Sequence, residues 1–562
     1  MTRTAANTPS YDHGASNQPL LGETIGENFN RMAMTHADRE ALVDRFTGRR
    51  WTYARLHHDV LALAHGLIRL GIDKGDRVGI WAPNCPEWTV LQYATAEIGA
   101  ILVPINPAYR TDELAYVVNQ AGIRLLVAAP SFRTSDYATM IEDARPGCPD
   151  LRWVVLLGSA DWLALPASGG DPRALAATLA TRQALLSPDD PINIQYTSGT
   201  TGHPKGATLS HHNILNNAHL TGEILGYTEL DRICVPVPLY HTFGMVIGNL
   251  GATTHGACLV YPAPAFDPAA TLAAVEEERC TSLYGVPAMF IAELAQPGFD
   301  AYDLSSLRTG AMGGAPCPVE VMKQVMDRMG MTEVTIVYGM TETSPVSAQT
   351  RVDDTLDRRV STVGRVHPHV EIKIVDPETG VTVPRGVPGE LCTRGYSVML
   401  GYWREPGKTT EAIDAARWMH TGDLATMDAD GYVAITGRLK DMVIRGGENV
   451  SPREIEEFLH THQDVQDVQV IGVPDARLGE EIMAWIRLRP GAPAMTAADV
   501  REFADGKLAH YKIPRYVRIV GDFPMTASGK VRKVEMREAA VSMLGLTDIA
   551  ASQYAGRIAG RA

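Results

Sequence analysis

The sequence predicts an α/β protein with a large N-terminal domain and a small α+β C-terminal domain. Its 562 residues exceed what one hydrophobic core supports, and 45% of them are apolar. Helix and strand patterns alternate over two long stretches, which is typical of parallel sheets covered by helices. From residue 370 the pattern changes to short strands separated by turns. We therefore expect two helix-covered sheets and a small β-barrel over residues 1–439, and the smaller domain over residues 440–562.

The first alternating block begins with a helix. Apolar residues from Leu56 to Leu70 recur every three or four positions, which indicates one buried helical stripe, and Gly71 ends it. The stretch from Gly158 to Asp190 is rich in Ala, Gly, Ser and Pro and predicts a surface connection. Between them we expect strands at 77–81, 101–103 and 125–127, and helices at 87–98 and from 111 onward.

The second alternating block begins with a strand at 192–195 and is followed by barrel strands and the C-terminal domain. Its further strands are expected near 233–235, 258–260 and 335–337. The barrel strands are expected at 370–375 and 390–393, and the C-terminal domain should contain a helix at 452–459 and a strand at 468–471.

Charge and cysteine content exclude several classes of protein. A net charge of -14 and a pI near 5.7 argue against nucleic-acid binding, which needs a basic face. The seven cysteines contain no C-x-x-C pair, so the sequence predicts neither a disulfide framework nor a zinc site and favours a reducing compartment. The first residues lack an apolar signal region, and no apolar run approaches the roughly 18 residues of a membrane span. We expect a soluble cytoplasmic protein without integral membrane association. Its oligomeric state stays open, with a homodimer as one option.

The segment from Tyr196 to Gly206 has the composition of a phosphate-binding loop. Its glycines permit positive φ and a close approach of the backbone to an anion, while its hydroxyl groups and one lysine offer donors and charge. A plain flexible loop would not explain Pro204, and the glycine spacing does not fit a P-loop. The predicted phosphate-binding residues are Thr197, Ser198, Gly199, Thr200, Thr201, Gly202 and Lys205.

This segment resembles the phosphate-binding signature of the adenylate-forming superfamily. Further signatures of that superfamily follow in its own order, at residues 240–244, 313–316, 338–342, 421–423, 437–441 and 526–530. The resemblance thus spans almost the whole chain. The amino-acid sequence at residues 399–403 and 444–449 is similar to that of the medium-chain branch, the acyl-CoA synthetase family member 2 type.

The resemblance implies an ATP-dependent fatty acyl-CoA ligase that uses Mg²⁺ and coenzyme A. Such an enzyme forms acyl-AMP and pyrophosphate, and then acyl-CoA and AMP. Matching residues imply that Glu342, beside Thr341, anchors Mg²⁺, that His241 orients the carboxylate, and that Lys530 stabilises the adenylation transition state. For the nucleoside, the resemblance implies that Asp423 and Arg438 bind the ribose and that Tyr338 stacks on the adenine ring. The strip beside that ring is implied at Gly313, Gly314 and Ala315, and Gly339 is also implied to bind ATP.

The two half-reactions need different surroundings, because Lys530 must leave before the thiol of coenzyme A enters. The resemblance implies that Lys440 is the hinge of a mobile C-terminal domain. It implies a passage for coenzyme A at Arg445, Gly446 and Gly447. The acyl chain length depends on a pocket that we place near Met245, Val246, Ala311 and Met312.

Two other functions remain open at this point. An adenylating enzyme could load another acid onto coenzyme A or onto a carrier protein, or an oxygenase could consume the adenylate. We expect a carrier to be separate, because the stretch after Lys533 is short. A non-catalytic acyl or nucleotide sensor would not need Lys530, His241, Glu342 and Asp423 together.

Overall fold

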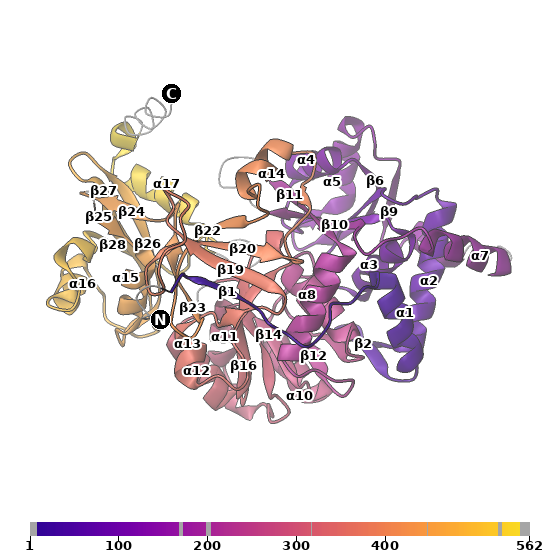
Figure 1. The fold of residues 1–562 in the computed structure, drawn as a ribbon, viewed down its shortest axis with the longest axis horizontal. Coiled ribbons are helices and arrows are strands. Elements are labelled where there is room, and N and C mark those ends of the chain that lie inside the picture. Colours follow the sequence, from indigo (N-terminus) through magenta and orange to yellow (C-terminus); the bar gives the residue numbers. More distant parts are fainter. Residues whose placement is uncertain are drawn as a thin grey trace.

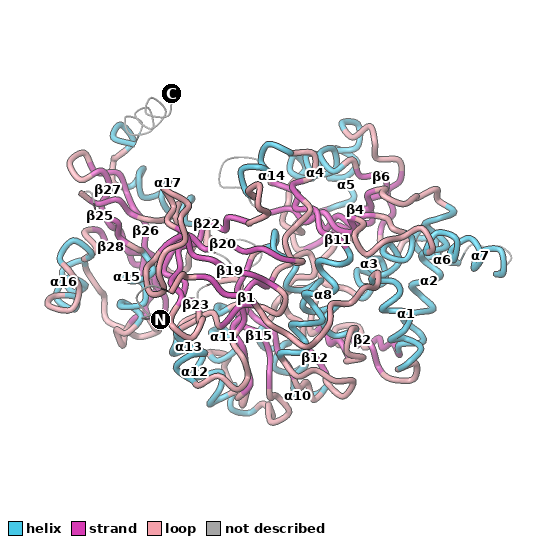
Figure 2. The backbone as a smooth tube through the Cα atoms, viewed as in Figure 1, coloured by secondary structure: helices cyan, strands magenta, loops and turns pink. Residues whose placement is uncertain are grey.

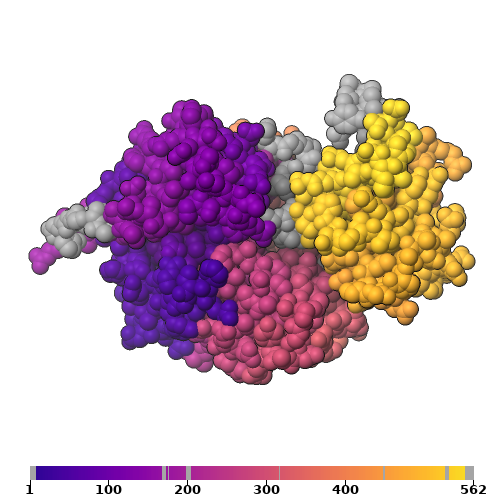
Figure 3. Space-filling model, turned by 180° about the vertical axis from the view of Figure 1, so that it is seen from behind, coloured from indigo at the N-terminus to yellow at the C-terminus, as the bar shows by residue number. Residues whose placement is uncertain are grey.

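The computed structural model describes residues 8–167, 172–197, 204–315, 317–446, 448–525 and 531–550. Figure 1 shows a large body, indigo to orange, and a smaller C-terminal body, gold to yellow, at its side. Seen from behind, the yellow lobe again lies beside the indigo and magenta parts (Figure 3).

The first predicted block forms the parallel strands β5, β4, β6 and β9 of a seven-stranded sheet, as predicted. The strand predicted at 192–195 was expected to begin the second block, but as β10 it joins this first sheet, parallel to β5, and β11 pairs with it antiparallel. In spatial order its strands are β21 (Gly401–Tyr402), β11 (Lys205–Ser210), β10 (Pro191–Thr197), β5 (Ile101–Pro104), β4 (Arg77–Trp81), β6 (Ile123–Ala128) and β9 (Trp153–Leu156). The helices of this block are α2 (Tyr53–Arg69), α3 (Pro86–Ile98), α4 (Thr111–Ala121) and α5 (Tyr137–Ala144). Helix α5 is preceded by the hairpin strands β7 (Ser131–Phe132) and β8 (Ser135–Asp136) and followed by the 3₁₀ turn η2 (Arg145–Gly147).

The ends of α2 follow the predicted signals. The side chain of Thr52 accepts a hydrogen bond from the N–H of Arg55 and caps the first turn. The helix stops before Gly71, which has φ of +83°. The buried stripe from Leu56 to Leu67 packs into the core of the first sheet.

The connection expected from Gly158 to Asp190 carries two helices that the composition did not predict. These are α6 (Ala160–Ala167) and α7 (Pro172–Gln183). The alanines that suggested a plain connection are the strongest helix formers, so the chain becomes helical where its glycines and prolines allow.

The second block forms a nine-stranded sheet, parallel from β2 to β16. In spatial order its strands are β18 (Arg365–Val366), β17 (Val346–Gln349), β16 (Glu333–Gly339), β15 (Thr309–Gly313), β14 (Ser282–Gly285), β12 (Arg232–Cys234), β13 (Cys258–Tyr261), β2 (Glu40–Asp44) and β3 (Arg49–Thr52). Its helices are α1 (Ile25–Thr35), α8 (His211–Ile224), α9 (Gly251–Thr253), α10 (Pro268–Glu278), α11 (Pro287–Leu294), α12 (Val319–Arg328) and α13 (Leu356–Ser361), with a π-helix η3 (Phe243–Leu250) before α9 and 3₁₀ turns η4 (Phe299–Ala301) and η5 (Thr341–Thr343).

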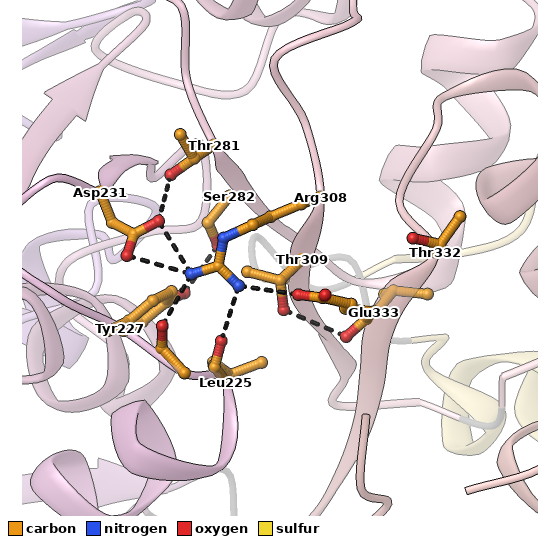
Figure 4. Close-up of polar contacts among 12 residues, drawn as sticks. Leu225, Tyr227, Asp231, Thr281, Ser282, Arg308, Thr309, Thr332 and Glu333 are labelled. Atoms are coloured by element: carbon orange, nitrogen blue, oxygen red, sulfur yellow. Dashed lines mark hydrogen bonds and ion pairs between the residues drawn. The ribbon is translucent and has the colours of Figure 1, made fainter. Parts of the chain in front are cut away.

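An ion-pair network around the buried Asp231 lies at the amino ends of these parallel strands. Arg308, one residue before β15, places Nη2 at 2.9 and 3.0 Å from the two carboxylate oxygens of Asp231, and Nη1 at 2.8 Å from Glu333 (Figure 4). Thr281 donates its hydroxyl to Asp231 at 2.6 Å. Since Asp231, Thr281, Arg308 and Glu333 come from four neighbouring strand starts, the network stabilises the order of the sheet at the edge opposite to its carboxyl ends.

The short strands predicted after residue 370 form an antiparallel sheet in the order β1-β19-β20-β22-β23. They are β1 (Tyr11–His13), β19 (Val370–Val375), β20 (Gly389–Gly395), β22 (Met419–Met427) and β23 (Val433–Arg438), and α14 (Pro406–Ala412) precedes β22. A barrel was expected, but among the described residues no pairing joins β1 to β23. The N-terminal strand β1 instead occupies one edge, beside β19 (Figure 2).

The C-terminal body has a sheet and helices of its own. Its strands are β24 (Val443–Arg445), β25 (Glu448–Val450), β26 (Val465–Asp475), β27 (Gly479–Leu488) and β28 (Tyr516–Ile519), and its helices are α15 (Pro452–His460), α16 (Ala497–Ala504), α17 (Lys533–Met543) and the 3₁₀ turn η6 (His510–Lys512). The helix and strand predicted here are confirmed as α15 and β26. Its apolar residues pack in two clusters that contain no residue before Val443.

No helix in the described part of the chain combines the length and the apolar character that a membrane crossing needs.

Candidate active site

The predicted ribose-binding residues meet at the junction of two sheets. Asp423 on β22 lies opposite Arg438 on β23, and Arg438 Nε donates to Asp423 Oδ1 at 2.9 Å. The hydroxyl of Tyr338, near the end of β16, donates to Asp423 Oδ2 at 2.8 Å. Asp423 is 7% exposed. Burial, together with the charge of Asp423, raises the pKa of Tyr338 well above its usual value, so its hydroxyl keeps the proton that it donates.

The predicted adenine strip lies at the carboxyl edge of the nine-stranded sheet. Gly313 and Gly339 are the last residues of the parallel strands β15 and β16, whose carboxyl ends share this edge. A Cβ at Gly313 would lie 2.6 Å from the carbonyl oxygen of Val337, and one at Gly339 would lie 1.9 Å from that of Pro345. Only glycine fits such close approaches of the backbone. Gly314 and Ala315 follow directly.

The predicted metal-binding carboxylate is buried in the turn η5 that follows β16. Glu342 is 5% exposed, and the Tyr402 hydroxyl donates to its Oε1 at 2.8 Å. Burial and the charge of Glu342 raise the pKa of Tyr402. The carboxylate of Glu342 and the neighbouring hydroxyl of Thr341 are hard oxygen donors of the kind Mg²⁺ prefers, so the residues present fit that ion.

The two described ends of the phosphate-binding segment form the base of a hairpin. Thr197 at the end of β10 pairs with Lys205 at the start of β11. The ammonium of Lys205 lies 5.0 Å from the ring centroid of Tyr402. Tyr402 therefore contacts both the phosphate hairpin and Glu342. The other predicted phosphate-binding residues, Ser198, Gly199, Thr200, Thr201 and Gly202, lie outside the described residues.

His241 precedes the π-helix η3 and is half-buried, with its ring 4.7 Å from that of Tyr240. The Gln195 side chain, two residues before Thr197, donates to the carbonyl oxygen of Tyr240. This bond fixes the His241 segment to the strand that carries the phosphate hairpin. The N–H of Met245 donates to the His241 carbonyl at 2.9 Å, so Met245 does lie one turn after His241.

The residues predicted to line the acyl pocket do not all meet. Met245, Val246 and Ala311 pack in one buried cluster, which also fills the space around η3. Met312 packs in a different cluster with residues such as Met322. Adjacent residues of a strand face opposite sides of the sheet, so Ala311 and Met312 on β15 cannot line the same cavity.

The predicted hinge lies in the turn between β23 and β24. The N–H groups of Asp441 and Met442 both donate to the carbonyl oxygen of Arg438 at 3.1 Å, which places Lys440 within this turn. Asp441 Oδ1 accepts from Arg537 of α17 at 2.7 Å. This ion pair links the residue next to Lys440 with a helix near the far end of the chain.

The predicted passage for coenzyme A is described in part. Arg445 binds the fully buried carboxylate of Glu481. Gly446 has φ of +61°, and its N–H donates to the carbonyl oxygen of Leu478 at 2.7 Å. Gly447 and Lys530 lie outside the described residues.

Sequence reasoning missed two functional contacts, Tyr402 with Glu342 and Gln195 with the His241 segment. Tyr402 is separated from Glu342 by 60 positions, and Gln195 from Tyr240 by 45. Neither residue type identifies its partner. The one available signal was that both stand beside signature segments.

The fold, with Tyr338 of the nine-stranded sheet joined to Asp423 and Arg438 of the antiparallel sheet, indicates an adenylate-forming enzyme. Comparison with protein families agrees: the AMP-binding enzyme family matches residues 29–403, and the AMP-binding enzyme C-terminal domain matches residues 454–530. The chain belongs to the AMP-binding enzyme family.

Individual relatives are similar over nearly their whole length. YngI of Bacillus subtilis is 48% identical over 94% of this chain and 99% of its own. The mitochondrial medium-chain acyl-CoA ligase ACSF2 of Danio rerio is 44% identical over 96% of this chain and 92% of its own. Among solved structures, ATP-bound MatB from Rhodopseudomonas palustris has a TM-score of 0.78 and 31% identity, over 92% of this chain and 99% of that one.

Proposed function

We propose that this protein is an ATP-dependent medium-chain fatty acyl-CoA ligase. The observation that carries the proposal is the Asp423 carboxylate, which Tyr338 and Arg438 hold at the carboxyl edge of the sheet. A carboxylate has about four acceptor positions, and these two donors leave room for two ribose hydroxyl groups. The medium-chain substrate is supported by the ACSF2 relative.

In the first half-reaction, a carboxylate oxygen of the fatty acid attacks the α-phosphorus of ATP, and the bond to pyrophosphate breaks. His241 orients the attacking carboxylate, which is already ionised at pH 7. Lys205 and the hydroxyl groups of the hairpin bind the β- and γ-phosphates. Glu342 and Thr341 would hold Mg²⁺, whose charge would offset that of the phosphates. Lys530 stabilises the charge that develops on the α-phosphate.

In the second half-reaction, the thiolate of coenzyme A attacks the acyl carbon, the bond to AMP breaks, and AMP leaves. We place the domain boundary at 439/440 and the hinge at Lys440, so that residues 440–562 rotate and exchange Lys530 for the passage at Arg445, Gly446 and Gly447. Since the guanidinium of Arg445 binds the buried carboxylate of Glu481, Arg445 contributes to this passage through its backbone or after releasing Glu481.

Location in the cytoplasm is part of the proposal. All seven cysteines carry free thiols, which supports a reducing compartment. A homodimer remains a proposal for the assembly.

The test is a panel of fatty acids of increasing chain length, assayed for pyrophosphate and AMP with and without coenzyme A. We expect pyrophosphate release that needs both acid and ATP, a maximum at medium chain length, and thioester formation that needs coenzyme A. Adenylate that accumulates without thioester would favour an enzyme that loads a separate carrier. Absence of acid-dependent pyrophosphate release would overturn the enzyme assignment in favour of a sensor.

A further inference from the structure

Helix α8 presents two metal-binding side chains on one face, and a third approaches from a neighbouring turn. His219 and Glu223 are four residues apart on α8, so their side chains lie one above the other. His255 lies in the turn after α9. One ligand atom of each, a ring nitrogen or a carboxylate oxygen, lies within 4.8 Å of the other two.

His255 is oriented as a metal-bound histidine usually is. Its Nδ1 lies 2.9 Å from the carbonyl oxygen of Gly251. Since a carbonyl oxygen only accepts, Nδ1 carries the proton, and in the neutral ring Nε2 has the lone pair. That Nε2 lies 3.3 Å from Oε1 of Glu223. Metal-binding histidines characteristically donate their second nitrogen to a backbone carbonyl, which fixes the tautomer. The ring also packs closely on Gly222, where a Cβ would lie 2.4 Å from it.

His219 offers a buried ring nitrogen to the cluster. Its ring stacks on that of His255, with centroids 5.1 Å apart. Its Nδ1 is buried, and among the described residues it has no hydrogen-bond partner.

We propose that His219, Glu223 and His255 form a binding site for one divalent transition-metal ion, of which Zn²⁺ and Co²⁺ are suitable examples. Two imidazole nitrogens and one carboxylate suit these ions, whereas Mg²⁺ and Ca²⁺ favour oxygen ligands alone. Ligands about 2.0–2.1 Å from Zn²⁺ stand about 3.3 Å apart in a tetrahedron. The Nε2–Oε1 distance of 3.3 Å already matches, and His219 closes the remaining gap by a side-chain rotation. Water completes the coordination.

The position of the site suggests what the ion does. Helix α8 begins directly after β11 of the phosphate hairpin, and η3 begins two residues after His241. The cluster joins the last turns of α8 and of the η3–α9 helix, at their far ends from the active site. The ion therefore stabilises the packing of α8 against the η3–α9 helix, the two elements that position the phosphate hairpin and His241. It does not contact the substrates.

The test measures metal binding itself and does not depend on the proposed ligase activity. Metal-free full-length protein without an affinity tag is titrated with Zn²⁺ against a chromophoric chelator, and with Co²⁺ while its visible absorption is recorded. We expect one ion per chain in this site. His255→Gln and Glu223→Gln should each weaken binding by at least about 10-fold. Loss of a residue that only hydrogen-bonds to a metal ligand already lowers affinity by about that factor, and these two residues are ligands themselves. The control His58→Gln, on α2 with a side chain 75% exposed, should leave the affinity unchanged.

A thermal measurement separates loss of the site from loss of the fold. Zn²⁺ should raise the unfolding midpoint of the wild type and of the control, because an ion that binds only the folded state stabilises it. Both cluster variants should unfold near the metal-free wild type and gain nothing from Zn²⁺. Zn²⁺ affinity that persists in both variants would assign the ion to thiols or to the Mg²⁺ site and overturn the proposal. So would a wild type that binds neither ion.

Discussion

Asp423→Asn tests the ribose site most directly. Arg438 Nε and the Tyr338 hydroxyl occupy one position on each carboxylate oxygen, at 2.9 and 2.8 Å. The asparagine amide that replaces the Asp423 carboxylate has one oxygen, with two acceptor positions, and an NH₂ group that only donates. If the NH₂ faces Arg438, two donors oppose each other. If it faces Tyr338, that hydroxyl can turn and accept. Either way at least one ribose hydroxyl loses its acceptor.

The expected magnitude follows from the kind of bond lost. A hydrogen bond to a charged group contributes about 1.5–3 kcal/mol, and about 1.4 kcal/mol corresponds to tenfold in an equilibrium constant. Asp423→Asn should therefore raise KM for ATP by about 10- to 150-fold. KM for the fatty acid should change little, because Asp423 is proposed to contact only the nucleoside. The assay is acid-dependent pyrophosphate release with ATP varied at saturating acid, and then with acid varied at saturating ATP.

Asp430→Asn is the matched control, since Asp430 lies in the turn after the same strand β22 but its side chain is 67% exposed. It should leave both constants near their wild-type values. A rise in KM for ATP below about threefold in Asp423→Asn, or an equal rise in the control, would refute the ribose assignment. Equal loss for ATP and acid would show that the variant damages the whole site, and unfolding midpoints would test that explanation.

Further outcomes are expected elsewhere in the chain. Lys530→Ala should slow adenylation by about 10²–10³-fold while leaving thioester formation from supplied acyl-adenylate nearly intact, and equal loss in both steps would contradict its role. Lys440→Pro should damage one half-reaction selectively, because proline fixes φ at the hinge; two wild-type rates would place the hinge elsewhere. Met245→Ala should shift the chain-length profile toward longer acids and Met245→Trp toward shorter ones, and a profile unchanged in both would remove Met245 from the pocket wall. Asp231→Asn should lower the free energy of unfolding by about 1.5–3 kcal/mol through loss of its bonds in Figure 4, whereas exposed Asp300→Asn should change it little.

The alternating elements could be predicted because their signal is local. The strand predicted at 77–81 is β4, and the one predicted at 370–375 is β19, with the same limits. Each is a short apolar or alternating run between turn residues, so the neighbouring few residues determine it. Prediction failed where local composition was ambiguous, as in α7, whose alanines occur among prolines and glycines. It failed also for β1, whose partner β19 lies some 360 positions away.

The candidate site could be predicted as a set of residues but not as an arrangement. The resemblance identified Tyr338 and Asp423 separately, as a stacking ring and a ribose acceptor. Their hydrogen bond joins residues 85 positions apart, and no spacing rule connects them. The acyl pocket shows the opposite case, in which residues adjacent in sequence do not meet in the structure. Ala311 and Met312 are neighbours in sequence, yet strand geometry sends them to opposite faces of β15.

Tyr402 shows why the arrangement matters to the chemistry. Lys205 and Glu342 carry opposite charges in one small region, and a direct ion pair would occupy the groups needed for phosphate and Mg²⁺. Between them stands the Tyr402 ring, with the ammonium 5.0 Å from its centroid and the carboxylate bound to its hydroxyl. Among the described residues no ion pair joins Lys205 to Glu342. The tyrosine thus satisfies both charges weakly and separately, which holds them in place while leaving a nucleotide and its metal ion free to compete for them.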